Sequence, residues 1–156
     1  MQKITPFLWF DNQAEEAVNF YVSVFKNSSI KSIARYPGGP MEGKVMTAQF
    51  ILDGQEFMAI DAGPVFKFTE AISLYVNCET QEEVDEYWKK FLDAGGQESQ
   101  CGWLKDKYGL SWQIIPSVLG KLMSDPDREK ANRVMQAMLG MKKIVVADLQ
   151  KAYDQV

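Results

Sequence analysis

The sequence predicts an α+β fold made of two tandem βαβββ units followed by C-terminal helices. Three observations predict it. A strand, an amphipathic helix and further strands occur twice in the same order, and positions of the first strand and helix recur 66 residues later, as in Leu8 and Leu74 or Tyr21 and Tyr87. The chain beyond Pro116 then changes to helical periodicity. We expect a single domain over residues 1–156, with units at 1–65 and 66–116 and a helical tail at 117–156.

In the first unit, the β-rich run Ile4–Phe10 predicts the opening strand. Apolar residues from Ala17 to Phe25 follow at helical spacing, and Asp11 or Asn12 is the expected N-cap of that helix. The hairpin signal Asp53-Gly54 separates the last two strands. The expected strands after the helix are 30–36, 44–52 and 55–60.

The second unit begins with an expected strand over residues 71–76. Thr80 and Glu83 form a capping box for a helix whose buried positions are expected to be Val84, Trp88, Phe91 and Leu92, and Gly95-Gly96 ends that helix. Residues 102–105 and 110–115 then read as a hairpin. Its turn starts at Asp106, whose side chain is expected to bond the backbone of the turn.

The tail is predicted to hold two further helices. Asp125 followed by Pro126 is typical of a helix start, and a stripe from Ala131 to Leu139 precedes Gly140. The last helix is expected over 144–153. The methionines of the stripe suit core or subunit contacts, and a pocket lid is the alternative.

Composition excludes several classes of function. Seventeen basic and 21 acidic residues give a net charge of −4, which does not favour nucleic-acid binding. No apolar run reaches the length of a membrane span, and no signal peptide is expected. The two cysteines favour a reducing, cytoplasmic location. The chain has no histidine, which excludes Ser–His and Cys–His catalysis and imidazole metal sites.

Several segments resemble one family closely. They are Phe10-Asp11 with Ala14-Glu15-Glu16-Ala17 and Phe20-Tyr21, then Phe57-Met58-Ala59 with Gly63-Pro64, the stretch 101–113, and 137–143 in the tail. On these segments the chain resembles the PhnB-like branch, described as 3-demethylubiquinone 3-methyltransferase-like, of the vicinal oxygen chelate superfamily, to which glyoxalases and bleomycin-resistance proteins also belong.

This resemblance implies a glyoxalase-like fold in which the two units form one concave cup, with a curved mixed sheet and helices on the convex side. It also implies a homodimer. Metal-dependent members carry ligands on the first and last strand of each unit, and the equivalent positions here are Thr5, Met58, Ala71 and Gln113. One hydroxyl and one amide do not replace the water shell of a divalent ion, so we expect no metal and no other cofactor.

Because strand residues alternate between faces, these positions also indicate which side chains face the cup. The expected pocket residues are Thr5, Phe7, Trp9, Met58, Ile60, Ala71, Ser73, Tyr75, Ser111 and Gln113. The opposite set, expected to pack on the helices, is Leu8, Phe10, Phe57, Ile72, Leu74, Val76, Trp112 and Ile114. The first set is aromatic and apolar with a few polar points, as small-molecule pockets are. Side chains that simply fill the cup are the alternative.

Two other residues are candidates for catalytic groups. Cys101 needs a neighbour such as Lys105 to become a nucleophile, and an inert half-buried thiol is the favoured interpretation. Asp61 is expected to contact a turn or helix rather than act as a base. No catalytic residue is therefore assigned, and whether the protein is an enzyme stays open.

The sequence favours a metal-free protein that binds a small apolar or planar molecule. An enzyme of the same superfamily is the first alternative, either a methyltransferase, as the family description says, or a glyoxalase- or dioxygenase-like enzyme. A structural dimerisation module with a filled cup is the second.

Overall fold

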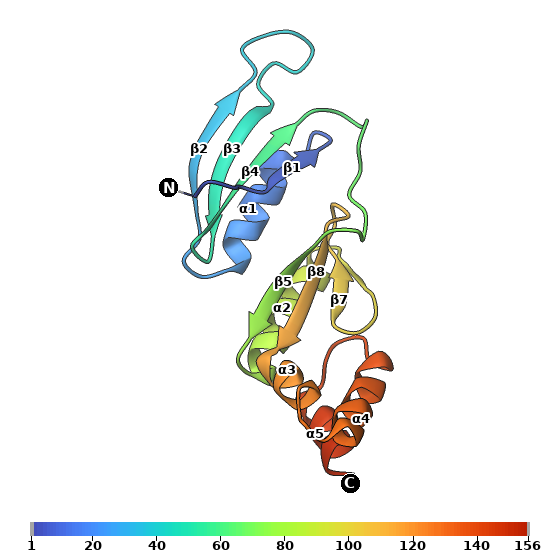
Figure 1. The fold of residues 1–156 in the computed structure, drawn as a ribbon. Coiled ribbons are helices and arrows are strands. Elements are labelled where there is room, and N and C mark those ends of the chain that lie inside the picture. The colour runs from blue at the N-terminus through green and yellow to red at the C-terminus, as the bar shows by residue number, and fades with distance from the viewer. Residues whose placement is uncertain (1, 156) are drawn as a thin grey trace. The chain divides into compact units, whose positions relative to one another are not determined.

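The computed structural model describes residues 2–155, and the chain divides into two compact units, Met1–Phe68 and Thr69–Val156 (Figure 1). Each unit holds one four-stranded sheet, and the described residues contain five helices. The α+β class with two mixed sheets is therefore confirmed. The expected single-domain organisation stays a prediction.

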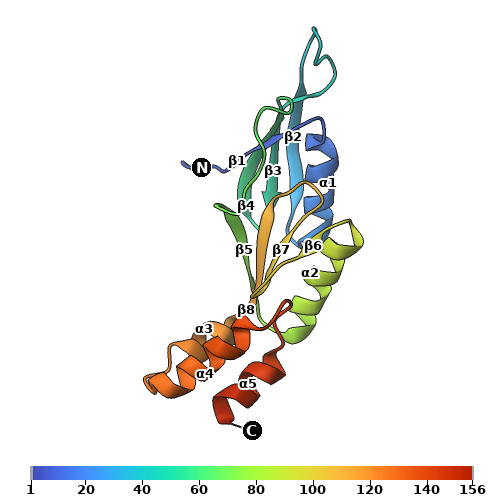
Figure 2. The ribbon, with the colours of Figure 1, turned by 90° about the vertical axis from the view of Figure 1, so that its right-hand side faces the viewer.

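The first unit has the predicted βαβββ order. Its elements are β1 (Phe7–Phe10), α1 (Ala14–Val24), β2 (Ser29–Arg35), β3 (Val45–Leu52) and β4 (Gln55–Asp61). The strands lie in the order β1-β4-β3-β2, with β1 parallel to β4 and the other pairs antiparallel. Helix α1 lies along one face of this sheet (Figures 1 and 2).

The second unit repeats this arrangement. Its elements are β5 (Ser73–Cys78), α2 (Gln81–Asp93), β6 (Gln97–Glu98), β7 (Trp103–Lys105), β8 (Ser111–Pro116), α3 (Ser117–Met123), α4 (Arg128–Leu139) and α5 (Val146–Asp154). The strand order β5-β8-β7-β6, with β5 parallel to β8, matches that of the first sheet element by element. The predicted repetition is confirmed.

The predicted cap of the first helix is wrong. Gln13 occupies the N-cap position and its side chain makes no capping bond, while Asn12 adopts a left-handed backbone with φ 63°. The carboxylate of Asp61 does the capping from the end of β4. Its Oδ1 accepts the Ala14 N–H at 2.8 Å and its Oδ2 accepts the Val45 N–H at 3.2 Å. The helix start is therefore satisfied by a residue distant in sequence.

The second helix begins as predicted. The Thr80 hydroxyl accepts the Glu83 N–H at 3.2 Å, and the Glu83 carboxylate accepts the Glu79 N–H at 2.9 Å. In the tail, however, Asp127 rather than Asp125 caps α4, because its carboxylate accepts the N–H groups of the first helical turn. The carboxylate of Asp125, two residues earlier, instead accepts the Asp127 N–H at 2.8 Å.

In each unit the helix packs on the predicted sheet face. Buried residues of that face include Leu8, Phe10, Phe57, Trp112 and Ile114. Ile72 was expected among them and is 59% exposed, because it precedes β5 instead of lying within it.

The tail helices form a cluster of their own around Ile115, Leu119, Val134, Ile144 and Leu149, against which Met138 packs. Within the described residues, no helix combines the length and the apolar character required to cross a bilayer.

Candidate functional site

The sheet face of the second unit that lies opposite α2 collects four predicted pocket residues. Ser73 is paired with Ser111, and Tyr75 with Gln113, across β5 and β8. Directly paired residues point to the same side of a sheet. Ser73, Ser111, Tyr75 and Gln113 therefore share one face, while Trp112 between them packs on Phe91 of α2 at 4.8 Å between ring centroids.

Strand β7 adds two residues to this face that were not expected there. Trp103 is paired with Gln113, and Lys105 with Ser111. The register of β5, β8 and β7 thus produces two rows, one with Ser73, Ser111 and Lys105, the other with Tyr75, Gln113 and Trp103. These two positions could have been predicted from the sequence. Strand residues alternate between faces, so Trp103 and Lys105, two residues apart in the strand before the Asp106 turn, lie on the same side.

The hydroxyl of Ser111 is the unusual polar group of this face. The residue is 1% exposed, and its Oγ makes no hydrogen bond with any residue that the structure describes. The neighbouring Ser73 hydroxyl, in contrast, accepts a hydrogen bond from Gln113 Nε2 at 2.9 Å. A buried hydroxyl without a partner costs about 1–3 kcal/mol, so Ser111 is a candidate for hydrogen bonding to a ligand.

Ser111 lines a cavity of about 180 Å³ within the second unit. The cavity is lined by Glu70, Gln97, Glu98, Ser99, Trp103, Leu104, Lys105 and Ser111. Lys105 forms an ion pair with Glu70, and this ammonium group holds the pKa of the Glu70 carboxyl below its ordinary value. The cavity therefore combines a paired charge, an aromatic ring and an unsatisfied hydroxyl.

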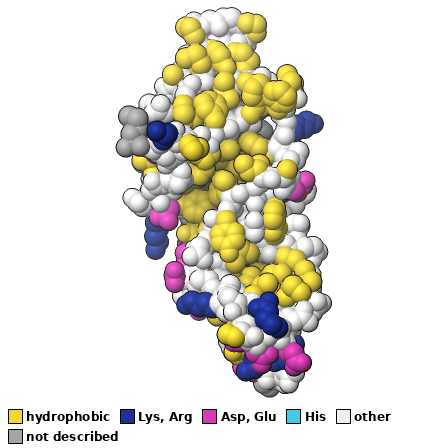
Figure 3. Space-filling model, in the orientation of Figure 1, with side chains coloured by type: hydrophobic (Ala, Val, Ile, Leu, Met, Phe, Trp, Pro, Cys, Tyr) yellow, Lys and Arg dark blue, Asp and Glu magenta, His cyan; other side chains and the backbone are white. Residues whose placement is uncertain are grey.

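The corresponding face of the first unit, opposite α1, is apolar. Phe7 pairs with Met58 and Trp9 with Ile60 across β1 and β4. Trp9 packs edge-on against Phe66 at 4.9 Å, and its Nε1 donates to the carbonyl of Gly63 at 2.9 Å. Phe7 and Phe66 are 50% and 63% exposed. Hydrophobic side chains gather on the side of this unit visible in Figure 3.

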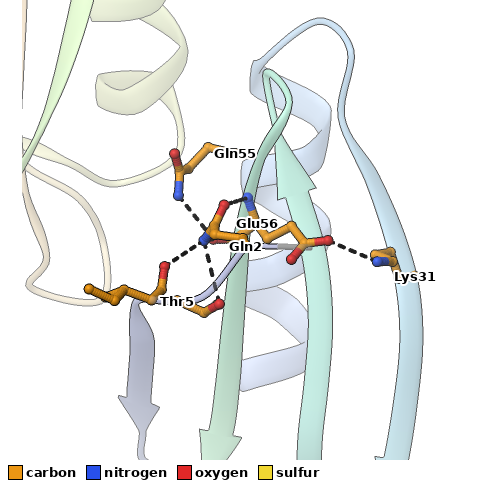
Figure 4. Close-up of polar contacts among 6 residues, drawn as sticks. Gln2, Thr5, Lys31, Gln55 and Glu56 are labelled. Carbon is orange, nitrogen blue, oxygen red and sulfur yellow. Dashed lines mark hydrogen bonds and ion pairs between the residues drawn. The ribbon is translucent and has the colours of Figure 1, made fainter.

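Thr5 lies before β1, in a segment held by Gln2 (Figure 4). Gln2 Nε2 donates to the carbonyl of Glu56 at 3.0 Å, and Gln2 Oε1 accepts the Glu56 N–H at 3.2 Å. The same amide donates to the Thr5 hydroxyl at 3.4 Å. The carboxylate of Glu56 is bound by Lys31 at 2.9 Å. Thr5 thus belongs to a structural network at the start of β4.

The four positions at which metal ligands were expected by resemblance do not form a donor set. Met58 and Gln113 lie within strands, whereas Thr5 and Ala71 precede β1 and β5, and Ala71 lies in a turn. A thioether, an amide, a hydroxyl and a methyl group do not fit a hard divalent ion. Over residues 2–155 no group of three or more cysteine, aspartate or glutamate side chains is placed to hold a metal ion.

Two acidic residues have the structural roles that the sequence predicted. Asp106 Oδ1 accepts the N–H groups of Tyr108 and Leu110 at 2.8 and 3.0 Å, and its Oδ2 accepts Trp112 Nε1 at 2.9 Å. Asp61 contacts α1, as described above. Both carboxylates are buried and fully engaged with the fold, which leaves neither in a position to act as a general base.

Cys101 lies where the tail joins the second sheet. Its backbone is left-handed, with φ 58°, and its N–H donates to the carbonyl of Met141 at 2.8 Å. Gly102 donates in the same way to Lys142. The left-handed backbone of Cys101 is thus explained by its contact with the tail. Cys101 does not belong to the sheet face that carries Ser111.

Comparisons with known proteins agree with this architecture. The family model described as 3-demethylubiquinone-9 3-methyltransferase matches residues 2–115. The match ends before α3, so the expected likeness of the tail segment 137–143 stays a prediction. A comparison with curated proteins found no match.

Among solved structures, a putative 3-demethylubiquinone-9 3-methyltransferase, PhnB protein, from Bacillus cereus is 48% identical, with a TM-score of 0.68 over 74% of this chain and 100% of that chain. Protein PA1353 from Pseudomonas aeruginosa is 19% identical, with a TM-score of 0.61 over 72% of this chain and 95% of that one. The fosfomycin resistance protein FosX from Listeria monocytogenes, in complex with Mn(II) and sulfate, is 14% identical, with a TM-score of 0.51 over 72% and 88% of the two chains.

The last two likenesses concern the fold alone. The family model and the Bacillus cereus relative concern the sequence as well, and they establish that this chain belongs to the PhnB-like family described as 3-demethylubiquinone-9 3-methyltransferase.

Proposed function

We propose that this protein binds a small apolar or planar molecule without a metal ion. The observation that supports this proposal best is the buried Ser111 hydroxyl, which has no partner among residues 2–155 and lies beside a cavity of about 180 Å³. A ligand that fills the cavity and bonds this hydroxyl would remove an energetic cost that the free protein carries.

The side chains around the cavity suit such a ligand. Trp103 offers an aromatic surface, and Tyr75 on the same face is 60% exposed. Aromatic contacts contribute about 0.5–1.5 kcal/mol beyond the area that they bury. The first unit presents Phe7 and Trp9 on an apolar face of its own. The candidate contacts are therefore taken separately for each unit: Thr5, Phe7, Trp9, Met58 and Ile60 in the first, and Ala71, Ser73, Tyr75, Ser111 and Gln113 in the second.

A screen of planar neutral compounds by thermal shift and tryptophan fluorescence tests the proposal. We expect binders whose affinity falls several-fold in Gln113→Ala, since the amide lies on the face opposite α2 and holds Ser73. Gln136→Ala, an exposed residue of α4, is the matched control and should bind as the wild type does. Failure of every planar compound, or an equal loss in both variants, would contradict the proposal.

The absence of a metal requirement is tested separately. The protein purified without chelator should contain well below one equivalent of manganese, iron, nickel or zinc per chain by elemental analysis. Ligand binding should also survive treatment with EDTA. A stoichiometric metal whose removal abolishes binding would refute the metal-free part of the proposal.

The family description favours methyl transfer as a second candidate function. Residues 2–155 contain no glycine-rich turn between a strand and a helix: Gly38 and Gly39 lie in the hairpin between β2 and β3. Calorimetry with S-adenosylmethionine discriminates the two, because a methyltransferase should bind it saturably. A dimerisation module with filled sheet faces would bind neither this compound nor the planar probes.

We also propose a homodimer in the cytoplasm. Exposed aromatic side chains, Phe7 and Phe66 in the first unit and Tyr75 in the second, support association between copies, since monomers rarely leave large apolar surfaces uncovered. The two free thiols, Cys78 and Cys101, support a reducing compartment. Sedimentation equilibrium should give twice the chain mass, and a monomer at micromolar concentration would contradict the first part.

A further inference from the structure

A row of hydrogen-bond donors crosses the second sheet beside the cavity. Ser73 is paired with Ser111, and Ser111 with Lys105, so two hydroxyls and an ammonium group lie next to one another on the face opposite α2. Gln97 of β6 continues the row, because it is paired with Lys105. Such a row is suited to a ligand that accepts hydrogen bonds and carries negative charge.

The Lys105 ammonium is already bound by a carboxylate of the chain itself. Glu70, from the segment before β5, forms the ion pair, and the two side chains are 42% and 61% exposed. Pairs as exposed as this one contribute no more than about 1 kcal/mol, so a ligand can displace Glu70 at low cost. Glu70 therefore occupies the place that a carboxylate of a ligand would take.

The other acid of the cavity lining is directed elsewhere. Glu98 is paired with Leu104, a buried residue of the face toward α2. Its Oε2 accepts Trp88 Nε1 of that helix at 2.9 Å. Glu98 lies on the side of the sheet that faces α2. The charged side chains of the cavity lining on the side of Ser111 are therefore Lys105 and Glu70, the carboxylate that competes with a ligand. This balance suits a singly charged anion, because one ammonium group compensates one negative charge.

We propose that the cavity binds a small organic monocarboxylate, whose carboxylate replaces Glu70 on Lys105 and accepts a hydrogen bond from the Ser111 hydroxyl. This inference rests on the proposed function and names the chemical class of its ligand. The planar or apolar body of the molecule lies against Trp103. A volume of about 180 Å³ is large enough for a ligand of about the size of benzoate.

Titration calorimetry with benzoate and benzamide tests this inference, because the two probes share size and planarity and differ in charge. We expect benzoate to bind up to about fivefold more tightly than benzamide, because an ion pair as exposed as this one contributes no more than about 1 kcal/mol. Lys105→Gln should abolish this preference for benzoate. Lys121→Gln, which removes an exposed charge from α3, is the matched control and should retain it.

Two further variants test the roles of Glu70 and Ser111. Glu70→Gln removes the competing carboxylate and should tighten benzoate binding by about threefold, the magnitude of an exposed ion pair. Ser111→Ala should weaken benzoate binding by about three- to tenfold through the lost hydrogen bond. Inorganic phosphate, a more highly charged anion, should not displace benzoate at equal concentration.

The outcomes separate this inference from the proposed function. Equal affinities for benzoate and benzamide, or a preference that survives Lys105→Gln, would overturn the carboxylate assignment while small-molecule binding stands. Weaker benzoate binding in Glu70→Gln would also overturn it, as would displacement by phosphate. Failure of both probes while other planar compounds bind would refute this inference alone.

Discussion

Replacing Asp61 by alanine should destabilise the first unit strongly, although the residue belongs to no candidate site. The carboxylate accepts the N–H groups of Ala14 and Val45, and these two residues are 0% and 1% exposed. Loss of a helix cap costs about 0.5–2 kcal/mol. A second buried N–H without a partner costs about 1–3 kcal/mol. Together we expect about 1.5–5 kcal/mol, because water does not reach either donor easily.

Urea unfolding followed by circular dichroism measures this loss, and amide hydrogen exchange locates it. Exchange at Ala14 and Val45 should accelerate more than at amides of the second unit. Asp61→Asn should have an intermediate effect, since its amide oxygen satisfies one donor while its NH₂ group faces the other. Asp11→Ala is the informative control, because Asp11 is exposed and its replacement should cost less than about 0.5 kcal/mol. A loss below 1 kcal/mol for Asp61→Ala, or an equal loss for Asp11→Ala, would refute the reasoning.

Three further predictions concern the second unit. Ser111→Ala should leave the free energy of unfolding unchanged or raise it by up to about 1 kcal/mol, because it removes a buried hydroxyl without a described partner, and a clear loss in urea denaturation would contradict this. Gly102→Ala should cost about 2–4 kcal/mol, since its φ is +84° and a Cβ would lie 2.6 Å from Ile115 Cδ1; Gly109→Ala, with φ +91° and no atom within 4 Å among the described residues, should cost only about 1 kcal/mol. Burial raises the pKa of the Cys78 thiol from 9.0 to about 12. Between these values the unfolded chain binds fewer protons than the folded one, so stability should fall by up to about 1.4 kcal/mol per pH unit above pH 9; denaturation at pH 8 to 11 should show this slope in the wild type and lose it in Cys78→Ala.

Local patterns predicted the elements well where the deciding contacts are themselves local. The Thr80–Glu83 capping box and the Asp106 turn are closed by bonds within a few residues, and both were predicted correctly. The cap of α1 was not, because Asp61 reaches it across 47 residues of sequence. Nothing in the neighbourhood of Ala14 indicates such a partner.

The candidate site shows the same difference between features set by local sequence and features set by distant contacts. Alternation along the strands sufficed to place Ser73, Tyr75, Ser111 and Gln113 on one face. Lys105 lies beside Ser111 because of the register between β7 and β8. Its ion pair with Glu70 depends on the path of the segment before β5. Register and loop course are set by contacts between distant segments, which a single sequence does not record.

The sequence alone determined that the chain forms two repeats of one strand–helix–hairpin unit. Apolar residues with a period of two or of 3.6 can be recognised in any stretch of consecutive residues, and they predict strands and helices. The sequence alone also excluded imidazole catalysis and imidazole metal sites, because it contains no histidine. Packing in three dimensions decided which carboxylate caps α1 and which hydroxyl is left without a partner beside the cavity. Those outcomes depend on where desolvated groups of remote segments meet, since burial, and not sequence proximity, sets the cost of an unsatisfied hydrogen bond.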